Sequence, residues 1–490
     1  LLWLACMVSV KALMQCFAHR GRSPWLGAAA GAVYLTLFGM TYACHVTFTV
    51  TAAVLGAAAV LQLCSIDGER YTDGQVFRAL MLALALTALC GGLRLICVLP
   101  VALYCGLALV PLAARDFGFG RRKKRSWKPL LCGLCVIVLA LGALPLWRAA
   151  KMKAAGMEDY LNGQTANGRV VDYYGIKGLT DEELALAGWT RKEANLLAQW
   201  CFLGSELTEE SFHRLADELD SRWKADPAVR LQSAWRKVTA LPELDPVAWR
   251  SVLALGGALL LCLLGLLWKK RDGLWQGLTL LAGLLAAGAF LLYLGWNGRL
   301  PVRAALQAIL PLAALAFGLL PACLPEKPGT AAKAVLSAGA ALALALTVNY
   351  AVPAAQALAR QPKNPEILDP FATLDWMAAE DPDCLYFYDG SLCADSRMFP
   401  RTDLGVPKNL LFWGGWTFRS PEYMKCLSRF GVTEQELDTE LFLRDDVYLA
   451  RGMVVPEPTE LIDVLSEKAG EEIVPMQSGE ESGVYLFQFY

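Results

Sequence analysis

The stretch ALMLALALTALCGGLRLICVLPVALYCGLALVPLAA, residues 79–114, decides the class of fold. It contains a single charged residue, Arg94. As one helix it would be about 54 Å long, whereas the apolar core of a bilayer is about 30 Å thick. The Cys90-Gly91-Gly92 sequence supplies a break, because glycine adopts turn conformations readily. We therefore predict two membrane spans, 79–91 and 95–113, of which the first is short.

The whole chain has the composition of a membrane protein. Of its 490 residues, 56% are hydrophobic and 19% are charged, whereas soluble domains have about 45–50% apolar and about 25% charged residues. Residue 1 is Leu and an apolar run is already under way there, so we expect the sequence to lack its N-terminus. Counting apolar runs long enough to cross a bilayer predicts about ten spans: 1–18, 25–44, 47–64, 79–91, 95–113, 128–147, 250–268, 274–295, 302–322 and 332–351.

The charges of the loops predict the orientation of these spans. ARDFGFGRRKKRSWK, residues 114–128, carries seven Lys and Arg and is cytoplasmic by the positive-inside rule. Alternation then places 16 Lys and Arg in cytoplasmic loops and three in the short outer turns, namely Arg94, Arg299 and Arg303. The RRKKR run is not interpreted as a nucleic-acid patch, because apolar spans flank it closely. We therefore expect no nucleic-acid partner.

Two long polar segments fall on the outer side. Residues 148–249 form a helical insert, in which Thr190 and Glu193 fit a capping box and three apolar residues share one helical face: Phe212, Leu215 and Leu219. Residues 352–490 alternate strand-like segments (CLYFYD, DVYLAR, EEIVPMQ, GVYLFQFY) with helix-like ones (TEQELDTELFL, PTELIDVLSEKAG). The expected fold is a polytopic α-helical membrane protein with transmembrane regions 1–147 and 250–351, a helical extracytoplasmic insert and a C-terminal extracytoplasmic α/β domain.

The three outer arginines are the strongest candidates for a binding site. Arg299 and Arg303, in LGWNGRLPVR, lie at the outer membrane boundary, where the charge rule gives no reason for them. Spaced four residues apart across the start of a helix, they can face one pocket, and the planar guanidinium suits phosphate oxygens. Arg94 would complete this lipid-phosphate site. In the alternative, all three are interfacial anchors that reach the outer headgroups.

Other polar residues near the membrane are candidates with less support. His45, in TYACHVTFTVT, and Tyr173, in NGRVVDYYG, are expected to line an outer cavity, or to be interfacial and packing residues. Asp172 is the carboxylate most suited to acid/base chemistry, against a structural role in a loop. Lys11 and Gln15 share one face of the first span, where a lysine is a functional candidate by default.

The remaining motifs exclude several classes of protein. Eleven of the 15 cysteines fall in or beside apolar runs, where buried packing explains them better than redox or zinc chemistry. Outside these runs, a bridge between Cys384 and Cys393 stays open. The three histidines lie far apart and no ATPase motif, nucleophile elbow or phosphate-binding glycine loop occurs, so we predict no metal site and no cofactor, with a divalent cation left open. In NLLFWGGWTFRSPEYM, Trp413 and Trp416 either stack on sugars or belong to a core.

Five segments in order resemble a known group of proteins: HVTFTVTAAVLGAAAVLQL, GGLRLICVLP, RVVDYYG, GWNGRLPVRAALQAILP and NLLFWGGWTFRSPEYM. The group comprises uncharacterised multi-pass membrane proteins of anaerobic bacteria, and the resemblance covers most of the chain. Their layout is similar to that of C-type glycosyltransferases, which use polyprenyl-phosphate sugars on the outer face of the plasma membrane. The resemblance directs attention to Arg94, Asp172, Arg299 and Arg303. It also implies a catalytic acidic residue in a first outer loop, which would precede residue 1.

Two functions are expected from these observations. The first is a membrane glycosyltransferase of the bacterial plasma membrane, which transfers a sugar from a polyprenyl-phosphate donor to a cell-envelope glycan or lipid. The arginines would hold the departing lipid phosphate and the polar segments would select the glycan acceptor. The alternative is a non-catalytic membrane protein, either a transporter or flippase or a scaffold for envelope assembly. Membrane lipids are partners in both cases.

Overall fold

The chain folds into two compact units, each built from two segments. Unit 1 comprises Leu1–Ala149 and Leu231–Arg360, and unit 2 comprises Ala150–Arg230 and Gln361–Tyr490. The structure is a computed structural model. It describes residues 1–40, 47–67, 70–117, 128–244, 246–269, 274–324, 370–393, 408–452, 458–481 and 484–490, with single positions between 330 and 352.

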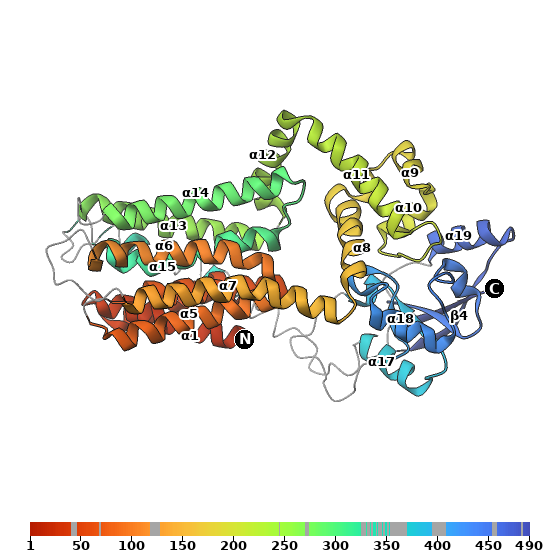
Figure 1. Cartoon of the computed structure of the whole chain (residues 1–490), viewed down its shortest axis with the longest axis horizontal. Helices are drawn as coiled ribbons and strands as arrows, with labels where there is room; N and C mark the ends of the chain where they lie inside the picture. The colour runs from red at the N-terminus through yellow and green to blue at the C-terminus, as the bar shows by residue number, and fades with distance from the viewer. Residues whose placement is uncertain are drawn as a thin grey trace. The chain divides into compact units, whose positions relative to one another are not determined.

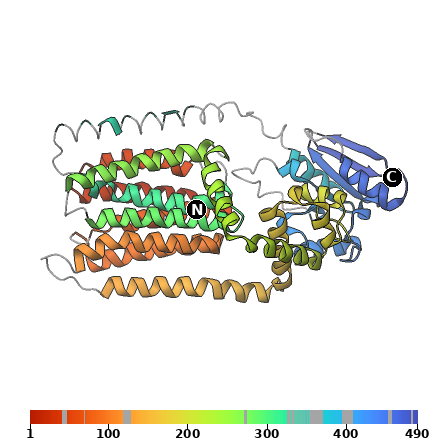
Figure 2. The ribbon, with the colours of Figure 1, turned by 90° about the horizontal axis from the view of Figure 1, so that it is seen from above.

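Unit 1 is a bundle of long apolar helices (Figures 1 and 2). Its first segment contains α1 (Leu2–His19), α2 (Pro24–Tyr34), η1 (Leu35–Met40), α4 (Phe48–Cys64), α5 (Asp73–Leu93), η2 (Leu95–Cys97), α6 (Val98–Phe117) and α7 (Lys128–Ala154). Its second segment contains most of α12 (Pro227–Leu244), followed by α13 (Pro246–Lys269), α14 (Leu274–Trp296) and α15 (Val302–Cys323).

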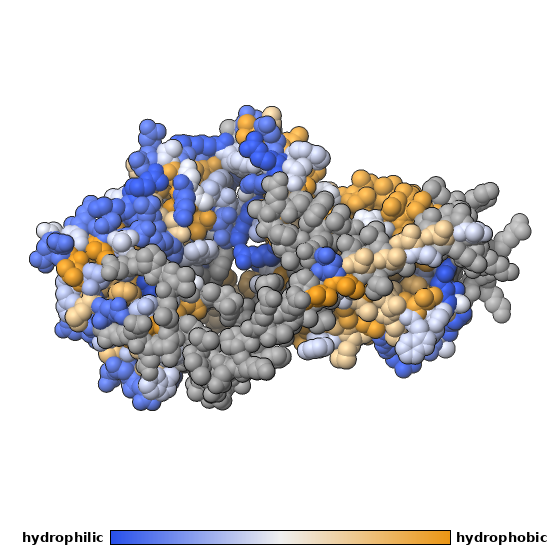
Figure 3. Space-filling view, turned by 180° about the vertical axis from the view of Figure 1, so that it is seen from behind, coloured by the Kyte–Doolittle hydropathy of each residue, from blue (hydrophilic) through white to orange (hydrophobic). Residues whose placement is uncertain are grey.

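The helices of unit 1 have the length and composition of membrane spans. Among the described residues, five helices are long and apolar enough to cross a bilayer: Leu2–His19, Asp73–Leu93, Leu95–Ala114, Leu274–Trp296 and Val302–Cys323. Apolar side chains cover much of the visible surface of unit 1 in Figure 3, whereas the visible surface of unit 2 is mainly hydrophilic. These features indicate a helical membrane protein. The count of ten spans stays a prediction.

The stretch 79–114 forms two helices, but their boundary differs from the predicted one. α5 continues through Gly91 and Gly92 to Leu93, so the turn follows the glycines and the first helix is not short. A Cβ at Gly91 would lie 2.6 Å from Val98 Cγ2 and 3.2 Å from Leu144 Cδ1. The glycine therefore permits close helix packing rather than a turn.

α4 and α15 form the centre of unit 1. α4 is buried at every position from Thr49 to Leu63, and α15 at every position from Ala305 to Leu319. Both helices are rich in Ala and Gly, which allows their backbones to approach closely. At Gly318, for example, a Cβ would lie 2.6 Å from the Cβ of Cys64. The two helices thus meet near their C-terminal ends and run in the same direction.

The first segment of unit 2 is helical, as predicted. It contains α8 (Glu158–Gly168), η3 (Arg169–Tyr174), η4 (Ile176–Gly178), α9 (Asp181–Ala187), α10 (Arg191–Ala198) and α11 (Glu209–Ala225). The predicted capping box begins α10: Thr190 N–H donates to the Glu193 carboxylate at 2.8 Å, and Glu193 N–H donates to the Thr190 hydroxyl at 3.2 Å. The predicted apolar face of α11 is also buried: Phe212, Leu215 and Leu219.

The second segment of unit 2 contains the predicted α/β fold. Its five-stranded sheet has the order β2-β1-β3-β5-β4, with β1 parallel to β2 and β3, and β5 antiparallel to β3 and β4. The strands are β1 (Leu385–Tyr388), β2 (Leu410–Phe412), β3 (Val447–Gly452), β4 (Pro475–Glu481) and β5 (Val484–Phe489), and the α-helices are α17 (Pro370–Glu380), α18 (Pro421–Leu427) and α19 (Thr459–Ala469). The predicted helix at TEQELDTELFL is wrong: that segment forms turns and the 3₁₀ helix η10 (Thr439–Leu443).

The two segments of unit 2 share one hydrophobic core, whereas the sequence predicts two separate domains at 148–249 and 352–490. Phe202 N–H donates to the Trp413 carbonyl at 3.1 Å. Gln164 Nε2 donates to the Phe418 carbonyl, also at 3.1 Å, and the rings of Phe202 and Phe418 are 5.8 Å apart. Neither segment buries its apolar side chains alone, so each completes the core of the other.

The two segments of unit 2 also approach each other closely at Gly414. A Cβ at this position would lie 1.7 Å from the Trp200 carbonyl oxygen and 2.6 Å from the Phe202 ring. Since the first of these is a backbone atom, the clash can be relieved only by moving the two segments apart. The glycine is therefore required for the shared core.

We predict that Gly414→Ala destabilises unit 2 by about 3 kcal/mol, at the upper end of the cost of overpacking. The melting temperature of the purified full chain should fall by roughly 6–12 °C, at about 2–4 °C per kcal/mol for a unit of this size. The control is Gly178→Ala, because an added Cβ there meets no atom within 4 Å. An equal response of the two variants would contradict the role assigned to Gly414.

Candidate functional site

Arg94 lies at the N-terminal end of α4. Its Nη1 donates to the Thr49 hydroxyl at 2.5 Å, and its guanidinium carbon is 5.1 Å from the centre of the Phe48 ring. The side chain is half-buried. A charge-assisted hydrogen bond and a cation–π contact together fix the position of this arginine.

Packing contacts place Arg303 at the same end of unit 1 as Thr49. α6 meets α4 where Val101 contacts Gly56. It meets α14 where the Tyr104 hydroxyl donates to the Gly283 carbonyl at 2.9 Å, and Gly283 contacts Leu312 of α15. At 1.5 Å per residue, Thr49 and Arg303 then both lie about 14 Å beyond Tyr104 in the same direction. We call this end of unit 1, which carries Arg94 and Arg303, the arginine end.

Arg299 occupies the turn between α14 and α15, also at the arginine end. The turn begins with Gly298, whose φ of +85° suits glycine. Lys237 Nζ donates to the Gly298 carbonyl, and Ala234 packs against Gly295. Arg299 is half-buried and Arg303 is exposed. Arg94, Arg299, Arg303 and Lys237 therefore lie at the same end of unit 1. That the three arginines form one binding site stays a prediction.

Lys237 is a basic residue of this site that the sequence analysis did not single out. It belongs to α12, in a region (148–249) predicted to be part of the insert. By its contacts, however, α12 packs from Leu231 onward against unit 1. One sequence feature could have identified this position: α12 mixes apolar and basic residues, as in LQSAWRKVTAL, which is typical of an amphipathic helix.

The other predicted site residues lie elsewhere. Asp172 and Tyr173 belong to η3 of unit 2, where Asp172 is half-buried and Tyr173 is exposed. In the same helix, Arg169 pairs with two carboxylates of α11, at 2.9 Å to Asp217 and 2.8 Å to Asp220. η3 therefore has a structural role in joining α8 to α11. His45 lies outside the described residues.

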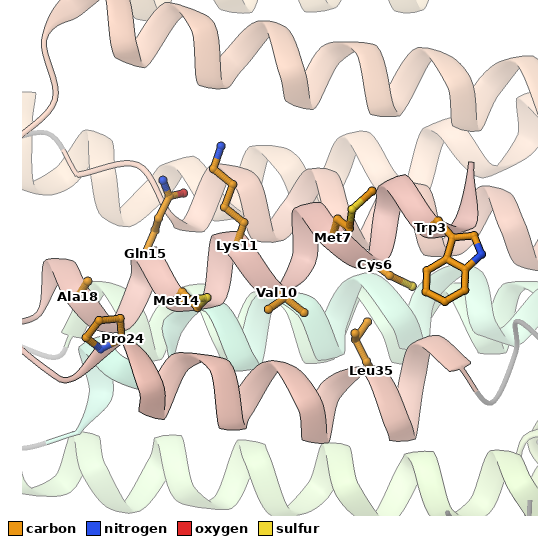
Figure 4. Close-up of a pocket in the computed structure, with 10 residues that line it drawn as sticks. All are labelled: Trp3, Cys6, Met7, Val10, Lys11, Met14, Gln15, Ala18, Pro24 and Leu35. Atoms are coloured by element: carbon orange, nitrogen blue, oxygen red, sulfur yellow. The ribbon is translucent and has the colours of Figure 1, made fainter. Parts of the chain in front are cut away.

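Lys11 and Gln15 line a groove on the surface of unit 1 (Figure 4). The groove has a volume of about 590 Å³ and is lined mainly by apolar side chains of α1, α2 and η1. Lys11 and Gln15 project to the same side of α1. The Gln15 Oε1 atom is buried and has no hydrogen-bond partner among the described residues. The predicted shared face of these two residues is confirmed.

Unit 2 contains a cleft of about 650 Å³ between its two segments. Its walls come from α8, from the N-terminal end of α11 and from the segment 418–437 (Figure 1 labels α8, α11 and α18). Arg419 lines the cleft with an unusual backbone conformation, φ +57°. Such a φ in a non-glycine residue costs about 1–2 kcal/mol, and strained residues gather at functional sites.

The environment of Arg419 is unusual for an arginine. Its Nε is buried and lacks a hydrogen-bond partner among the described residues, and its guanidinium carbon lies 5.4 Å from the centre of the Phe418 ring. Burial lowers the pKa of Arg419, while the nearby Glu434, Tyr423 and Glu209 act in the opposite direction. The guanidinium thus has carboxylates near it but no acceptor bonded to its Nε.

The aromatic stretch around Arg419 belongs to the core. Trp413 is 1% exposed, which favours the core interpretation of this residue over stacking on sugars. The side chain of Trp416 lies outside the described residues. Arg419, in the same NLLFWGGWTFRSPEYM stretch, was not singled out from the sequence. The sequence feature that could have drawn attention to Arg419 is its position directly before Ser420-Pro421, where α18 begins.

Cysteine and metal chemistry find little support in the described part of the chain. Most of its membrane-region cysteines are buried, as predicted, but Cys135 is exposed on α7. Cys384 is a free thiol, and the side chain of Cys393 lies outside the description. The described residues contain no group of three or more His, Cys, Asp or Glu side chains that could hold a metal ion.

The comparisons with known proteins return no relative. No protein-family model matches the chain, and no curated protein or solved structure matches it.

We predict that Arg419→Gly is more stable than Arg419→Ala. Both variants lack the guanidinium, but glycine adopts φ +57° at about 1 kcal/mol lower cost than alanine. Its melting temperature should be about 2–4 °C higher. At Arg429, in the 3₁₀ helix η9 (Ser428–Phe430), the same pair should show the opposite order, because φ there is not positive. The same order at both positions would argue against strain at Arg419.

Proposed function

We propose that the chain is a membrane glycosyltransferase that transfers a sugar from a polyprenyl-phosphate donor to a cell-envelope glycan or lipid. The observation that carries the proposal is the placement of Arg94, Lys237, Arg299 and Arg303 at the same end of the helical unit. In this proposal the basic side chains bind the lipid phosphate and stabilise the charge that develops on it as the sugar leaves.

The contacts of α7 and α12 support this arrangement. Leu144 of α7 contacts Gly91, three residues before Arg94, and α7 then continues to Ala154. α12 contacts the turn at Gly298 through Lys237. α7 and α12 thus contact unit 1 next to the turns that carry Arg94 and Arg299.

A non-catalytic role in lipid binding or transport is the second candidate. It is favoured by the positions of the carboxylates: those with described side chains in unit 1, Asp67 and Asp73, lie between α4 and α5, at the end opposite the arginines. Neither can act as a base on an acceptor at the arginine end. Sugar transfer from a radiolabelled polyprenyl-phosphate donor by the purified chain distinguishes the two functions.

The proposed topology places both segments of unit 2 on the outer side. Because they share one core, they must lie on the same side of the membrane, and the chain between residues 230 and 361 must cross it an even number of times. α13, α14 and α15 would account for three crossings. The fourth is the predicted span 332–351, most of which lies outside the described residues.

We predict that an impermeant thiol reagent labels Lys177→Cys and Lys425→Cys from outside intact cells, in excess of the parent chain. Lys123→Cys, in the predicted cytoplasmic loop, should react only after the membrane is permeabilised. Opposite accessibility of positions 177 and 425 would contradict the shared core. Labelling of position 123 from outside would instead reverse the proposed orientation.

We predict that the double variant Arg299→Ala, Arg303→Ala binds polyprenyl phosphate at least about tenfold more weakly than the parent chain, because each hydrogen bond to a charged group contributes about 1.5–3 kcal/mol. Binding is measured in nanodiscs, with polyprenol as the ligand that lacks phosphate. The control is Arg78→Ala, an exposed arginine near the start of α5. Equal binding by all three proteins would assign the outer arginines to interfacial anchoring.

A further inference from the structure

We propose that the cleft of unit 2 is a saccharide site, which takes a neutral or amino-substituted sugar of one or a few rings. This goes beyond the arginine end, because the cleft lies in the other unit and is formed by residues 156–212 and 418–437. The proposal rests on the proposed function only where it identifies this saccharide with the acceptor.

The cleft presents unsatisfied hydrogen-bonding groups of both kinds. Arg419 Nε is a buried donor, and Asn167 Oδ1 is a buried acceptor, and neither has a partner among the described residues. A buried polar group without a partner costs about 1–3 kcal/mol. A sugar hydroxyl both donates and accepts, so neighbouring hydroxyl groups of one ring can satisfy both atoms.

The rim of the cleft is acidic. Its carboxylates are Asp159, Glu209, Glu210 and Glu434, and Arg419 is the one basic side chain among the described residues that line it. This excess of negative charge disfavours a phosphate or a polycarboxylate ligand. Carboxylates accept hydrogen bonds only, so they suit a ligand with many donors, such as hydroxyl groups or an ammonium group.

Arg419 does not need an anionic ligand to balance its charge. Glu434 and Glu209 lie close enough to stabilise the charged guanidinium. What its Nε lacks is a hydrogen-bond acceptor, and a neutral hydroxyl oxygen is sufficient for that. A saccharide therefore fits the cleft better than an amino acid, whose carboxylate would also meet the acidic rim.

The size and rigidity of the cleft agree with such a ligand. Its volume of about 650 Å³ lies within the range of about 300–1,000 Å³ that is usual for small-molecule sites. Gln164 is buried in α8 and donates to the Phe418 carbonyl at 3.1 Å, which holds the backbone directly before Arg419. In the same helix, Gly163 leaves room for the Glu209 carboxylate of α11, whose carbon would be 3.3 Å from a Cβ there. The polar groups are thus positioned before a ligand arrives.

The test is saturation-transfer NMR with the purified full chain in nanodiscs that contain no polyprenyl phosphate. The probes are glucose, N-acetylglucosamine and glucosamine, compared with glutamate and inorganic phosphate. We expect saturable binding of at least one saccharide. Arg419→Gly, which suits the backbone at this position, should weaken that binding about tenfold, and Asn167→Ala about threefold, in line with the loss of one hydrogen bond each. The control Arg222→Ala should bind as the parent chain does, because Arg222 pairs with Glu218 and Glu183 away from the cleft.

Three outcomes would overturn the proposal: no saccharide binds, glutamate or phosphate binds in place of the saccharides, or both cleft variants bind as tightly as the parent chain. These outcomes do not depend on whether the proposed glycosyltransferase function is correct. Saccharide binding by a chain that fails to bind polyprenyl phosphate would keep the cleft as a saccharide site and remove the glycosyltransferase.

Discussion

The rest of unit 2 depends on one main-chain contact, between the carbonyl of Trp200 and the backbone of Gly414. At this point the helical segment and the sheet segment are too close for any side chain. Phe202, two residues further on, then packs its ring near those of Phe212 and Phe418. The cleft lies between these two segments, and α8 and Arg419 both line it. The contact therefore sets how closely the two segments can pack.

Unit 1 depends on a different constraint, the need to satisfy backbone polar groups without water. Long helices meet this need, and the Ala- and Gly-rich faces of α4 and α15 allow them to pack at short distance. Most charged side chains are then confined to the ends of the bundle. The arginine end carries four basic side chains, and unit 2 contains a separate polar cleft.

Local features were predictable from the sequence, and features that join distant segments were not. The capping box at Thr190 and the buried face of α11 depend on neighbouring residues, so their patterns identify them. The apolar run 79–114 identified two helices, but Gly91 was assigned to a turn, because glycine serves turns and close packing equally well. The role of Arg419 could not be predicted, since it depends on Gln164 of α8, which lies 254 positions from Phe418.

The core of unit 2 comes from two distant segments, which affects how this unit folds during synthesis on the ribosome. The helical segment emerges first, with Trp189, Phe202 and Phe212 unable to find their partners until the C-terminal strands have been made. Domains usually fold one after another as they are synthesised. Unit 2 cannot follow this order, because the helices of residues 231–360 are synthesised between its two segments. During that interval part of the apolar surface of the helical segment lacks its packing partners. Unit 2 therefore completes its core only after the whole of residues 231–360 has been synthesised.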